Sequence, residues 1–463
     1  MPPTVYPTGT TIYYPEKCWN GYTLFQTELH RKNTRGAVLI DMNGNVVNRW
    51  KGLDGMPNKM LPGGHVLGST GVRHFKYGYQ DMVDLVEVDW DGKTVWKFDR
   101  YELVKDPWQK PRWMARQHHD YQREGNPVGY YVPGMEPKTG GGRTLILCHK
   151  NIKNPIISDK MLLDDTIIEV DVEGKITWEW ICSEHFEEMG FSPRAKITLK
   201  HNPGITPMGG GKGDWMHMNS MSTLGPNRWF DSGDGRFHPD NIIWDGRQTN
   251  ITAVIDRKTG KIVWQLGPYF TARKALRNIG QIIGQHHAHM IPRGLPGEGN
   301  ILMYDNGGAA GYGAPNPTAP DGVSNARRDF SRVLEIDPIT LEIKWQYPKP
   351  MPGPGGGGSG RLYSSFVSSA QRFPNGNTLI TEGNGGCLIE VTPEHETVWE
   401  YVSPYLHRML KTPLIYRAYR TPYEWAPQAE RAEETAVKKK DNRKFRVPGS
   451  PKKQRERVTR IKL

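Results

Sequence analysis

Six segments of the chain share one pattern of hydrophobic and polar positions. In each, alternating apolar residues lead into a short polar turn, and a second alternating run ends near a tryptophan. Alternation with a period of two predicts a strand, and the turn joins two strands into a β-hairpin. The tryptophans of the six predicted hairpins are Trp50, Trp96, Trp178, Trp264, Trp345 and Trp399.

A second repeated pattern lies between the hairpins: a turn followed by a short apolar strand. It occupies residues 61–70, 141–150, 298–308 and 374–386, with a weaker copy at 225–233. One hairpin plus one or two further strands per repeat is typical of a propeller blade. We therefore predict an all-β fold, a six-bladed β-propeller with long loop insertions between strands and a basic C-terminal tail. The alternative is a β-helix or sandwich array, and irregular repeat lengths disfavour a helical solenoid.

The two ends of the chain are expected to close the ring. The last hairpin lacks a following strand, and residues 22–29 form a strand that precedes the first hairpin. We expect this N-terminal strand to complete the final blade, since closure removes exposed sheet edges. Residues 1–424 then form a single propeller domain. Residues 425–463 form an extended or disordered basic tail.

The positive charge is concentrated in that tail. The whole chain carries +12, and residues 438–463 hold 12 Lys and Arg against two acids, a net +10 that leaves +2 for the rest. A nearly neutral body gives no support for nucleic-acid binding, and the tail is expected to be solvated.

Other sequence features narrow the setting. The four cysteines lie far apart without a CxxC pair, which disfavours a zinc knuckle or redox motif and leaves one disulfide open. No signal-peptide pattern and no apolar run of membrane-spanning length occur, so we expect a cytoplasmic protein, or a periplasmic one if a signal was removed. We expect no membrane partner, and a homo-oligomer stays open.

Histidines gather in two related segments. These are Gln285-His286-His287-Ala288-His289 and Gln117-His118-His119-Asp120-Tyr121. In an extended strand Gln285, His287 and His289 would share one face, and His286 and Ala288 the other. Because inner strands of a propeller converge on its axis, imidazoles from several blades can meet there. Imidazole suits nucleophilic, acid–base and metal chemistry near neutral pH.

Several motifs occur in an order that resembles the bacterial arylsulfate sulfotransferase family, with gaps, over residues 35–405. They are DWMHMNS (214–220), IDRKTGKIVWQLG (255–267), QHHAHMIP (285–292), NILMYDNGG (300–308), SRVLEID (331–337), SAQRFPNGNTLI (369–380) and EVTPEHETVWEY (390–401). The resemblance implies a six-bladed propeller. It also implies sulfuryl transfer between phenols through a sulfated histidine on the axis, with His, Asn and Arg side chains holding the sulfate oxygens.

The resemblance also implies particular residues. His217 and Asn219 fall in the family's HxNS-like segment, His286 in its Gln-His segment, and Arg332 in its Ser-Arg segment. With the residues above, the candidate catalytic set is His118, His119, His217, His286, His287, His289 and Arg332. The candidate substrate-binding set is Asn219, Asn306, Tyr121, Tyr363 and Gln371.

Sulfuryl transfer to a small aromatic substrate requires no cofactor. Two other functions are alternatives to it. A lyase or hydrolase would use a divalent metal held by imidazoles. Its candidate ligands are His119, His217, Gln285, His287 and His289. The third hypothesis is a non-catalytic binding platform, because a propeller fold alone does not decide function.

Overall fold

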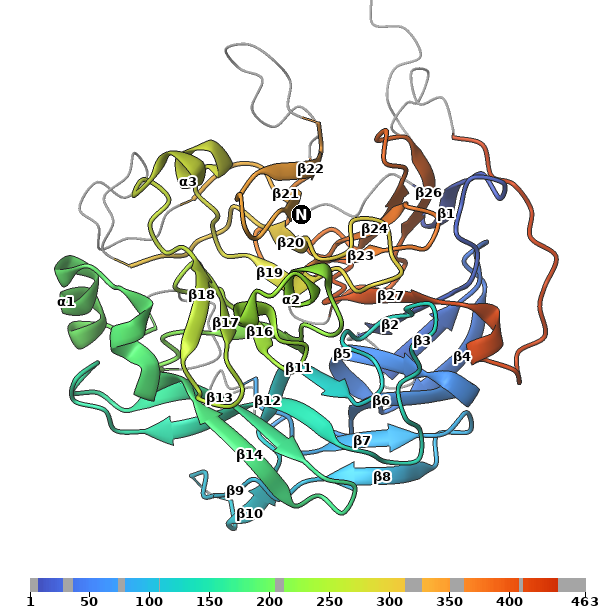
Figure 1. Cartoon of the computed structure of the whole chain (residues 1–463). Helices are drawn as coiled ribbons and strands as arrows, with labels where there is room; N and C mark the ends of the chain where they lie inside the picture. The colour runs from blue at the N-terminus through green and yellow to red at the C-terminus, as the bar shows by residue number, and fades with distance from the viewer. Residues whose placement is uncertain are drawn as a thin grey trace, which may run out of the picture.

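The computed structural model describes residues 7–27, 36–73, 80–107, 109–204, 212–312, 327–349, 362–407 and 411–439. The Gly/Pro-rich run 350–360 and the basic stretch from residue 440 onward lie outside these ranges. Six antiparallel sheets follow one another around a central axis, which confirms the predicted six-bladed propeller (Figure 1).

Each sheet is one blade, with its strands ordered from the axis outward. The first blade contains β27 (Ala418–Thr421), β2 (Tyr22–Thr27), β3 (Gly36–Ile40) and β4 (Val46–Lys51). The second contains β5 (Asp54–Leu61), β6 (His65–Ser69), β7 (Leu85–Val88) and β8 (Thr94–Phe98). The third contains β11 (Gln117–Arg123), β12 (Thr144–Ile152), β13 (Leu162–Val170) and β14 (Ile176–Ile181).

The other three blades repeat this arrangement. The fourth contains β15 (Met218–Thr223), β16 (Ile242–Gly246), β17 (Ile251–Ile255) and β18 (Ile262–Leu266). The fifth contains β19 (His286–Met290), β20 (Ile301–Asp305), β21 (Arg332–Ile336) and β22 (Ile343–Tyr347). The sixth contains β23 (Ser369–Arg372), β24 (Thr378–Glu382), β25 (Cys387–Val391), β26 (Thr397–Val402) and, at its outer edge, β1 (Gly9–Tyr13).

Short elements lie in the connections between strands. The small sheet pairs β9 (Glu102–Val104) with β10 (Arg112–Met114). The helices are α1 (Pro193–His201), α2 (Arg228–Asp231) and α3 (Lys274–Ile279), and the 3-10 turns are η1 (Pro62–Gly64), η3 (Cys182–Met189), η4 (Gly235–Phe237) and η5 (Tyr423–Trp425). No helix among the described residues is long and apolar enough to cross a membrane. All four cysteines are free, so the disulfide that the sequence left open is not formed.

Both chain ends take part in closing the ring, but not in the way the sequence suggested. The C-terminal strand β27 is the innermost strand of the first blade and pairs with β2, and in Figure 1 the red strand lies beside the blue one. At the other end, β1 pairs with β26 of the sixth blade. The expectation that residues 22–29 complete the final blade is therefore wrong, because that strand is already the second strand of the first blade.

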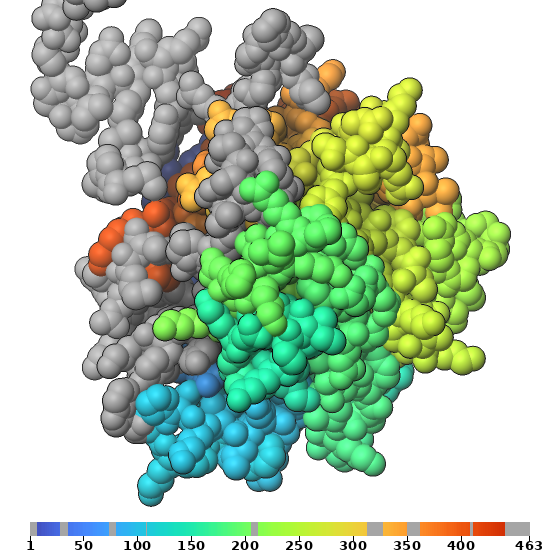
Figure 2. Space-filling view, turned by 90° about the vertical axis from the view of Figure 1, so that its left-hand side faces the viewer, coloured from blue at the N-terminus to red at the C-terminus, as the bar shows by residue number. Residues whose placement is uncertain are grey.

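An indole from each blade binds the hairpin turn of the next. Trp50 donates its Nε1 hydrogen to Asp89 O at 2.8 Å, and Trp399 closes the circle on Met42 O at 2.7 Å. In the third blade Trp178 has the predicted position, paired with Glu169 as Trp96 is with Glu87, but the donor to the next blade is Trp180, bonded to Gly260 O. The full ring of donors is Trp50, Trp96, Trp180, Trp264, Trp345 and Trp399. Neighbouring blades are thus joined by packing and by a directed hydrogen bond, and Figure 2 shows them side by side.

The first part of the segment expected as a tail contacts the propeller. Trp425 is buried and its ring packs edge-on against Tyr131, with centroids 5.8 Å apart. Val437 forms a backbone bridge with Tyr13. The extended or disordered character of residues 440–463 stays a prediction.

Truncation of Trp425 is expected to destabilise the protein. The Trp425→Ala variant should lose about 3–5 kcal/mol of unfolding free energy, because it leaves a cavity between the C-terminal segment and the first two blades. Urea unfolding measures this loss. Trp113, which is 49% exposed, offers the matched control, and Trp113→Ala should change stability by less than about 0.5 kcal/mol. Equal effects in the two variants would contradict the docking of this segment.

Candidate active site on the propeller axis

Three histidines near the starts of the innermost strands of consecutive blades have a left-handed backbone. The angle φ is 55° at His119, 53° at His217 and 56° at His287. Each residue lies at or next to a β-bulge in the pairing of its strand. A bulge re-aims a side chain, and a positive φ at a non-glycine residue costs on the order of 1–3 kcal/mol, strain that clusters at functional sites. The repeated Gln-His-His segments therefore mark one strained position in the blade.

Asp214 orients the ring of His217. Its Oδ2 lies 2.5 Å from His217 Nδ1, so this nitrogen carries a hydrogen and the ring is held with Nε2 pointing away from the carboxylate. The ring of His119 meets that of His217 edge to face, with centroids 4.7 Å apart. An imidazole oriented by a carboxylate thus lies against a second imidazole from the neighbouring blade.

His119 and His287 are neutral bases. Burial lowers the pKa of His119 well below its ordinary value, and the neighbouring imidazoles, His217 first, add to the effect. Burial does the same to the pKa of His287, with a further contribution from Arg417. A neutral imidazole can act as a nucleophile or accept a proton at neutral pH.

The other two histidines of the fifth blade are fully engaged. His286 donates from Nδ1 to Asn306 Oδ1 at 2.7 Å and accepts at Nε2 from Val367 N at 3.1 Å. His289 donates from Nδ1 to the His287 carbonyl and accepts at Nε2 from Tyr130 Oη. His287 and His289 do share a face, as predicted, with ring centroids 4.4 Å apart.

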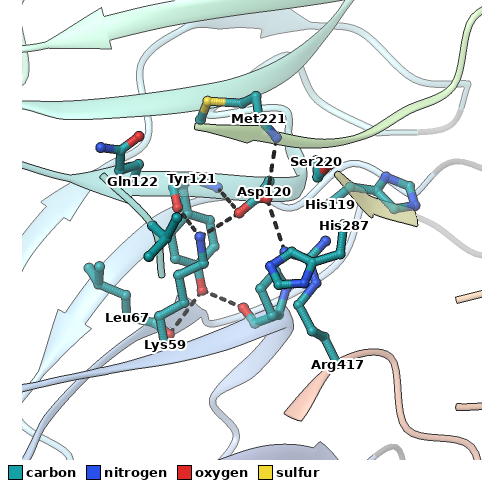
Figure 3. Close-up of polar contacts among 12 residues, drawn as sticks. Lys59, Leu67, His119, Asp120, Tyr121, Gln122, Ser220, Met221, His287 and Arg417 are labelled. Atoms are coloured by element: carbon teal, nitrogen blue, oxygen red, sulfur yellow. Dashed lines mark hydrogen bonds and ion pairs between the residues drawn. The ribbon is translucent and has the colours of Figure 1, made fainter. Parts of the chain in front are cut away.

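A buried ion cluster lies further along the inner strands. Asp120 accepts from Lys59 Nζ at 2.5 Å and from Arg417 Nη1 at 3.0 Å, and Figure 3 shows both cations beside it. Burial opposes ionisation of Asp120, but the two cations hold its pKa below its ordinary value. Beside the cluster, a cavity of about 10 Å³, lined also by Ser220 and His287, has room for about one water molecule. The axis is therefore closely packed at this depth.

Neutralising Asp120 is expected to destabilise the protein. The Asp120→Asn variant leaves Lys59 and Arg417 buried without a counter-charge, which should cost about 3–5 kcal/mol of unfolding free energy. Urea unfolding tests this, with Asp240→Asn as a control, because that carboxylate has 75% of its side chain exposed. If the Asp120→Asn variant is as stable as the control variant, the ion cluster does not stabilise the fold.

Arg247 places an incompletely paired guanidinium near the histidines. Its side chain is buried, and neither Nε nor Nη1 has a hydrogen-bond partner. Its backbone N donates to His217 O at 3.0 Å, and its charge lowers the pKa of His286, an effect second to that of burial. Burial lowers the pKa of Arg247 itself to about 10, which leaves it cationic at neutral pH. Buried N–H groups of a cation without partners indicate a site for an anion.

One group of described side chains has the spacing of a metal site but not its orientation. Ligand atoms of His118, His149 and Asp165 all lie within 4.8 Å of one another. The two imidazoles, however, stack nearly parallel, with centroids 3.5 Å apart and planes at 13°. A nitrogen lone pair lies in the ring plane, so one ion cannot lie in line with both rings. In the predicted metal set, Gln285 donates from Nε2 to backbone carbonyls, and its Oε1, the atom that would bind an ion, is buried without a hydrogen-bond partner. The divalent metal of the alternative function stays a prediction.

Comparison with known proteins decides the family. The model of the arylsulfotransferase (ASST) family matches residues 138–403, which is more than half of the chain. The chain belongs to this family. Arylsulfotransferases are enzymes, and the family implies an aryl sulfate or phenolic substrate.

Other comparisons bear on the fold alone. A search of the curated proteins finds no match. A protein of unknown function from Bacteroides caccae has 11% identity and a TM-score of 0.45, over 87% of this chain and 99% of that chain. The β-propeller domain of Cps50 (Swd1) from Myceliophteria thermophila has 10% identity and a TM-score of 0.37, over 88% and 90% of the two chains.

In this arylsulfotransferase-family chain, Arg332 pairs with an aspartate of its own blade. Its Nε donates to Asp305 Oδ2 at 2.8 Å, and its Nη2 lies near two backbone carbonyls. Asp305 on the neighbouring strand holds its guanidinium, and a place for Arg332 beside the cluster stays a prediction. The arginines whose charges act on these histidines are Arg247, on His286, and Arg417, on His287.

The predicted substrate-binding residues are mostly engaged elsewhere. Gln371 bonds the backbone N and O of Arg420, and Tyr121 donates to the carbonyls of Pro57 and Leu67. Asn306 holds His286 and two backbone carbonyls. Tyr363 is 41% exposed. Asn219 donates to Gln285 O while its Oδ1 is buried without a partner, which leaves it the best placed of the five.

Sequence reasoning missed several residues of this arylsulfotransferase-family site. Asp214 stands three residues before His217, within a motif already noted, and an Asp-x-x-His spacing was a usable signal. No local sequence pattern indicates a role for Arg247 or Arg417, because their neighbours in the site come from other blades.

Proposed function

We propose that the protein transfers a sulfuryl group from an aryl sulfate to a phenol, with His217 as the transiently sulfated residue. The observation that carries the proposal is the buried Arg247 guanidinium with unpartnered N–H groups, next to the Asp214–His217 pair. A sulfate monoester brings both an anion for Arg247 and an electrophilic sulfur for His217. Family membership supports the substrate class.

The chemistry runs in two half-reactions. His217 Nε2 attacks the sulfur, the bond between sulfur and the aryl oxygen breaks, and the phenolate leaves with a proton from an acid. The acceptor phenol then gives up its proton, its oxygen attacks the sulfur, and the bond to His217 breaks. Asp214 stabilises the imidazole during both steps, and Arg247 stabilises charge on the sulfuryl oxygens.

Aromatic side chains at the site suit a phenolic substrate. Tyr416 is buried and its ring packs edge-on against His119, with centroids 5.5 Å apart. Its hydroxyl lies 3.1 Å from Asn219 O, so the ring is held in place. Fixed aromatic surface beside the imidazoles favours an aryl group over a flexible aliphatic one.

Incubation with 4-nitrophenyl sulfate and phenol tests the proposal. We expect nitrophenol release that depends on the acceptor, phenyl sulfate as the product, and ping-pong kinetics. Without acceptor, mass spectrometry should find one SO₃ group on the peptide that contains His217. Addition of a chelator should change nothing. Acceptor-independent hydrolysis, or loss of turnover with the chelator, would favour a hydrolase or a metal enzyme instead.

A further inference from the structure

Three side chains form a buried line from the inside of the third blade to the site. Asp165 Oδ1 on β13 lies 3.0 Å from His118 Nε2 on β11. The other nitrogen of the same ring, Nδ1, lies 2.8 Å from His119 Nδ1. In this ring orientation the two groups are in contact without a formed hydrogen bond, and His149 Nε2 lies 3.6 Å from the same Asp165 oxygen. His119 then meets His217, so the line ends at the proposed nucleophile.

The contact between two Nδ1 atoms restricts where hydrogens can be. A hydrogen bond between two imidazole nitrogens needs one hydrogen, on one nitrogen or the other. If His118 donates, its Nε2 is bare and requires a protonated Asp165, while His119 carries its hydrogen on Nε2. If His119 donates, its Nε2 is bare, His118 carries its hydrogen on Nε2, and Asp165 is a carboxylate. The line therefore has two self-consistent states that differ by one proton.

We propose that Asp165, His118 and His119 form a proton relay that supplies the acid and base of sulfuryl transfer. In the first half-reaction His119 Nε2 gives its proton to the departing aryl oxygen. His118 passes the hydrogen on Nδ1 to His119 Nδ1, and Asp165 passes its proton to His118 Nε2. The negative charge moves to Asp165. In the second half-reaction every step reverses, and the acceptor's proton restores the first state. The proposal rests on the proposed function for its chemistry.

The surroundings of Asp165 favour titration near neutral pH. Burial raises the pKa of Asp165 to about 7, and Asp214 adds to this effect while His149 and His217 oppose it. Asp165 Oδ2 accepts from Met218 N, and His149 Nε2 lies 3.6 Å from Oδ1. The neighbouring Asp164 faces Ser183 and Trp215 instead.

His118 passes protons without becoming a cation. Burial lowers the pKa of His118 to about 3, so the ring does not carry two hydrogens at neutral pH. It must therefore release the hydrogen on Nδ1 as it receives one on Nε2. Its ring is held by the parallel stack on His149, which Asp81 anchors at Nδ1 with a 2.6 Å contact. Asp81 is in turn paired with Arg73 and Arg116. This support fixes the ring in the orientation that the relay requires.

Nitrogen NMR of histidine-labelled protein tests the relay without substrate. As pH rises through about 7, the hydrogens of His118 and His119 should switch nitrogens together, with neither ring becoming cationic. In Asp165→Asn the asparagine keeps an acceptor for Met218 N and donates to His118, so the first state should persist at all pH values. The proposal is overturned if the two rings keep their hydrogens through the titration, or if Asp165→Asn still switches.

Kinetics test whether the relay serves catalysis. Phenolate is a poor leaving group that needs a proton, whereas 4-nitrophenolate is a good one that needs it little. We therefore expect Asp165→Asn to lower kcat/KM for phenyl sulfate about 10²-fold more than kcat/KM for 4-nitrophenyl sulfate. The matched control is Asp164→Asn, an equally buried neighbour on the same strand whose pKa is also raised to about 7 by burial. It should keep the wild-type ratio of the two kcat/KM values. Equal ratios in the two variants would overturn the catalytic role of the relay. A wild-type protein that is inactive on all aryl sulfates would instead overturn the proposed function, and the NMR result alone would then decide whether the relay exists.

Discussion

Replacing His217 with alanine is expected to lower kcat by about 10⁴-fold or more and to abolish the sulfated enzyme. Neither of two neighbouring histidines replaces the nucleophile, because His286 has both nitrogens engaged and His119 is assigned to proton transfer. Asp214→Asn should lower kcat by about 10²–10⁴-fold, since the amide can no longer stabilise the imidazole as it bonds to sulfur. Steady-state kinetics and mass spectrometry of the enzyme incubated with donor measure both effects.

Controls separate the loss of a nucleophile from general damage. His238 is an exposed histidine on the fourth blade, with 47% of its side chain accessible, and His238→Ala should retain activity. Free imidazole should restore part of the activity of His217→Ala by filling the vacated space. A His217→Ala enzyme that still becomes sulfated would move the nucleophile to another histidine, with His287 the next candidate because its Nδ1 is buried without a partner.

The propeller could be predicted from the sequence because blades are built from local patterns. Period-two alternation and polar turns identified all six hairpins. What alternation left open is which indole binds the next blade, because Ile176-Thr177-Trp178-Glu179-Trp180 has two tryptophans on one face. Trp178 pairs with Glu169 as Trp96 pairs with Glu87, and the bulge follows at the same position, yet the hydrogen bond comes from Trp180.

The prediction of ring closure failed for an electrostatic reason. The strand β27 contains Arg420 and follows Arg417, so it does not resemble a buried inner strand. Both arginines are nevertheless buried, because Arg417 pairs with Asp120 and Arg420 with Glu390 on other blades. A charged segment can lie on the axis only when its partners come from other blades, and no local pattern records them.

Only part of the site could be predicted from the sequence, because some of its residues depend on partners from other blades. Histidine spacing identified the imidazoles, since their residue type is itself the signal. The proposed roles of Arg247 and Asp165 depend on what surrounds them after folding: an absence of partners for one and a neighbouring imidazole for the other. Arg332, which a sequence motif suggested as a site residue, pairs with Asp305 on the adjacent strand.

Replacing Arg247 with methionine is expected to lower kcat/KM by about 10²–10³-fold and at the same time to leave the protein as stable as wild type or more so. The activity falls because the sulfuryl oxygens lose their cation. The stability does not fall, since the variant removes a buried charge whose N–H groups are unsatisfied and replaces it with a side chain of similar length. Arg116→Met gives the opposite sign: its guanidinium is paired with Asp81 and Glu102, so the change should cost about 3–5 kcal/mol. Thermal unfolding with added inorganic sulfate completes the test, because an anion bound to the folded state raises the melting temperature of the wild type but not of Arg247→Met. A destabilised Arg247→Met protein, or one that sulfate still stabilises, would show that Arg247 is a structural residue and that the anion binds elsewhere.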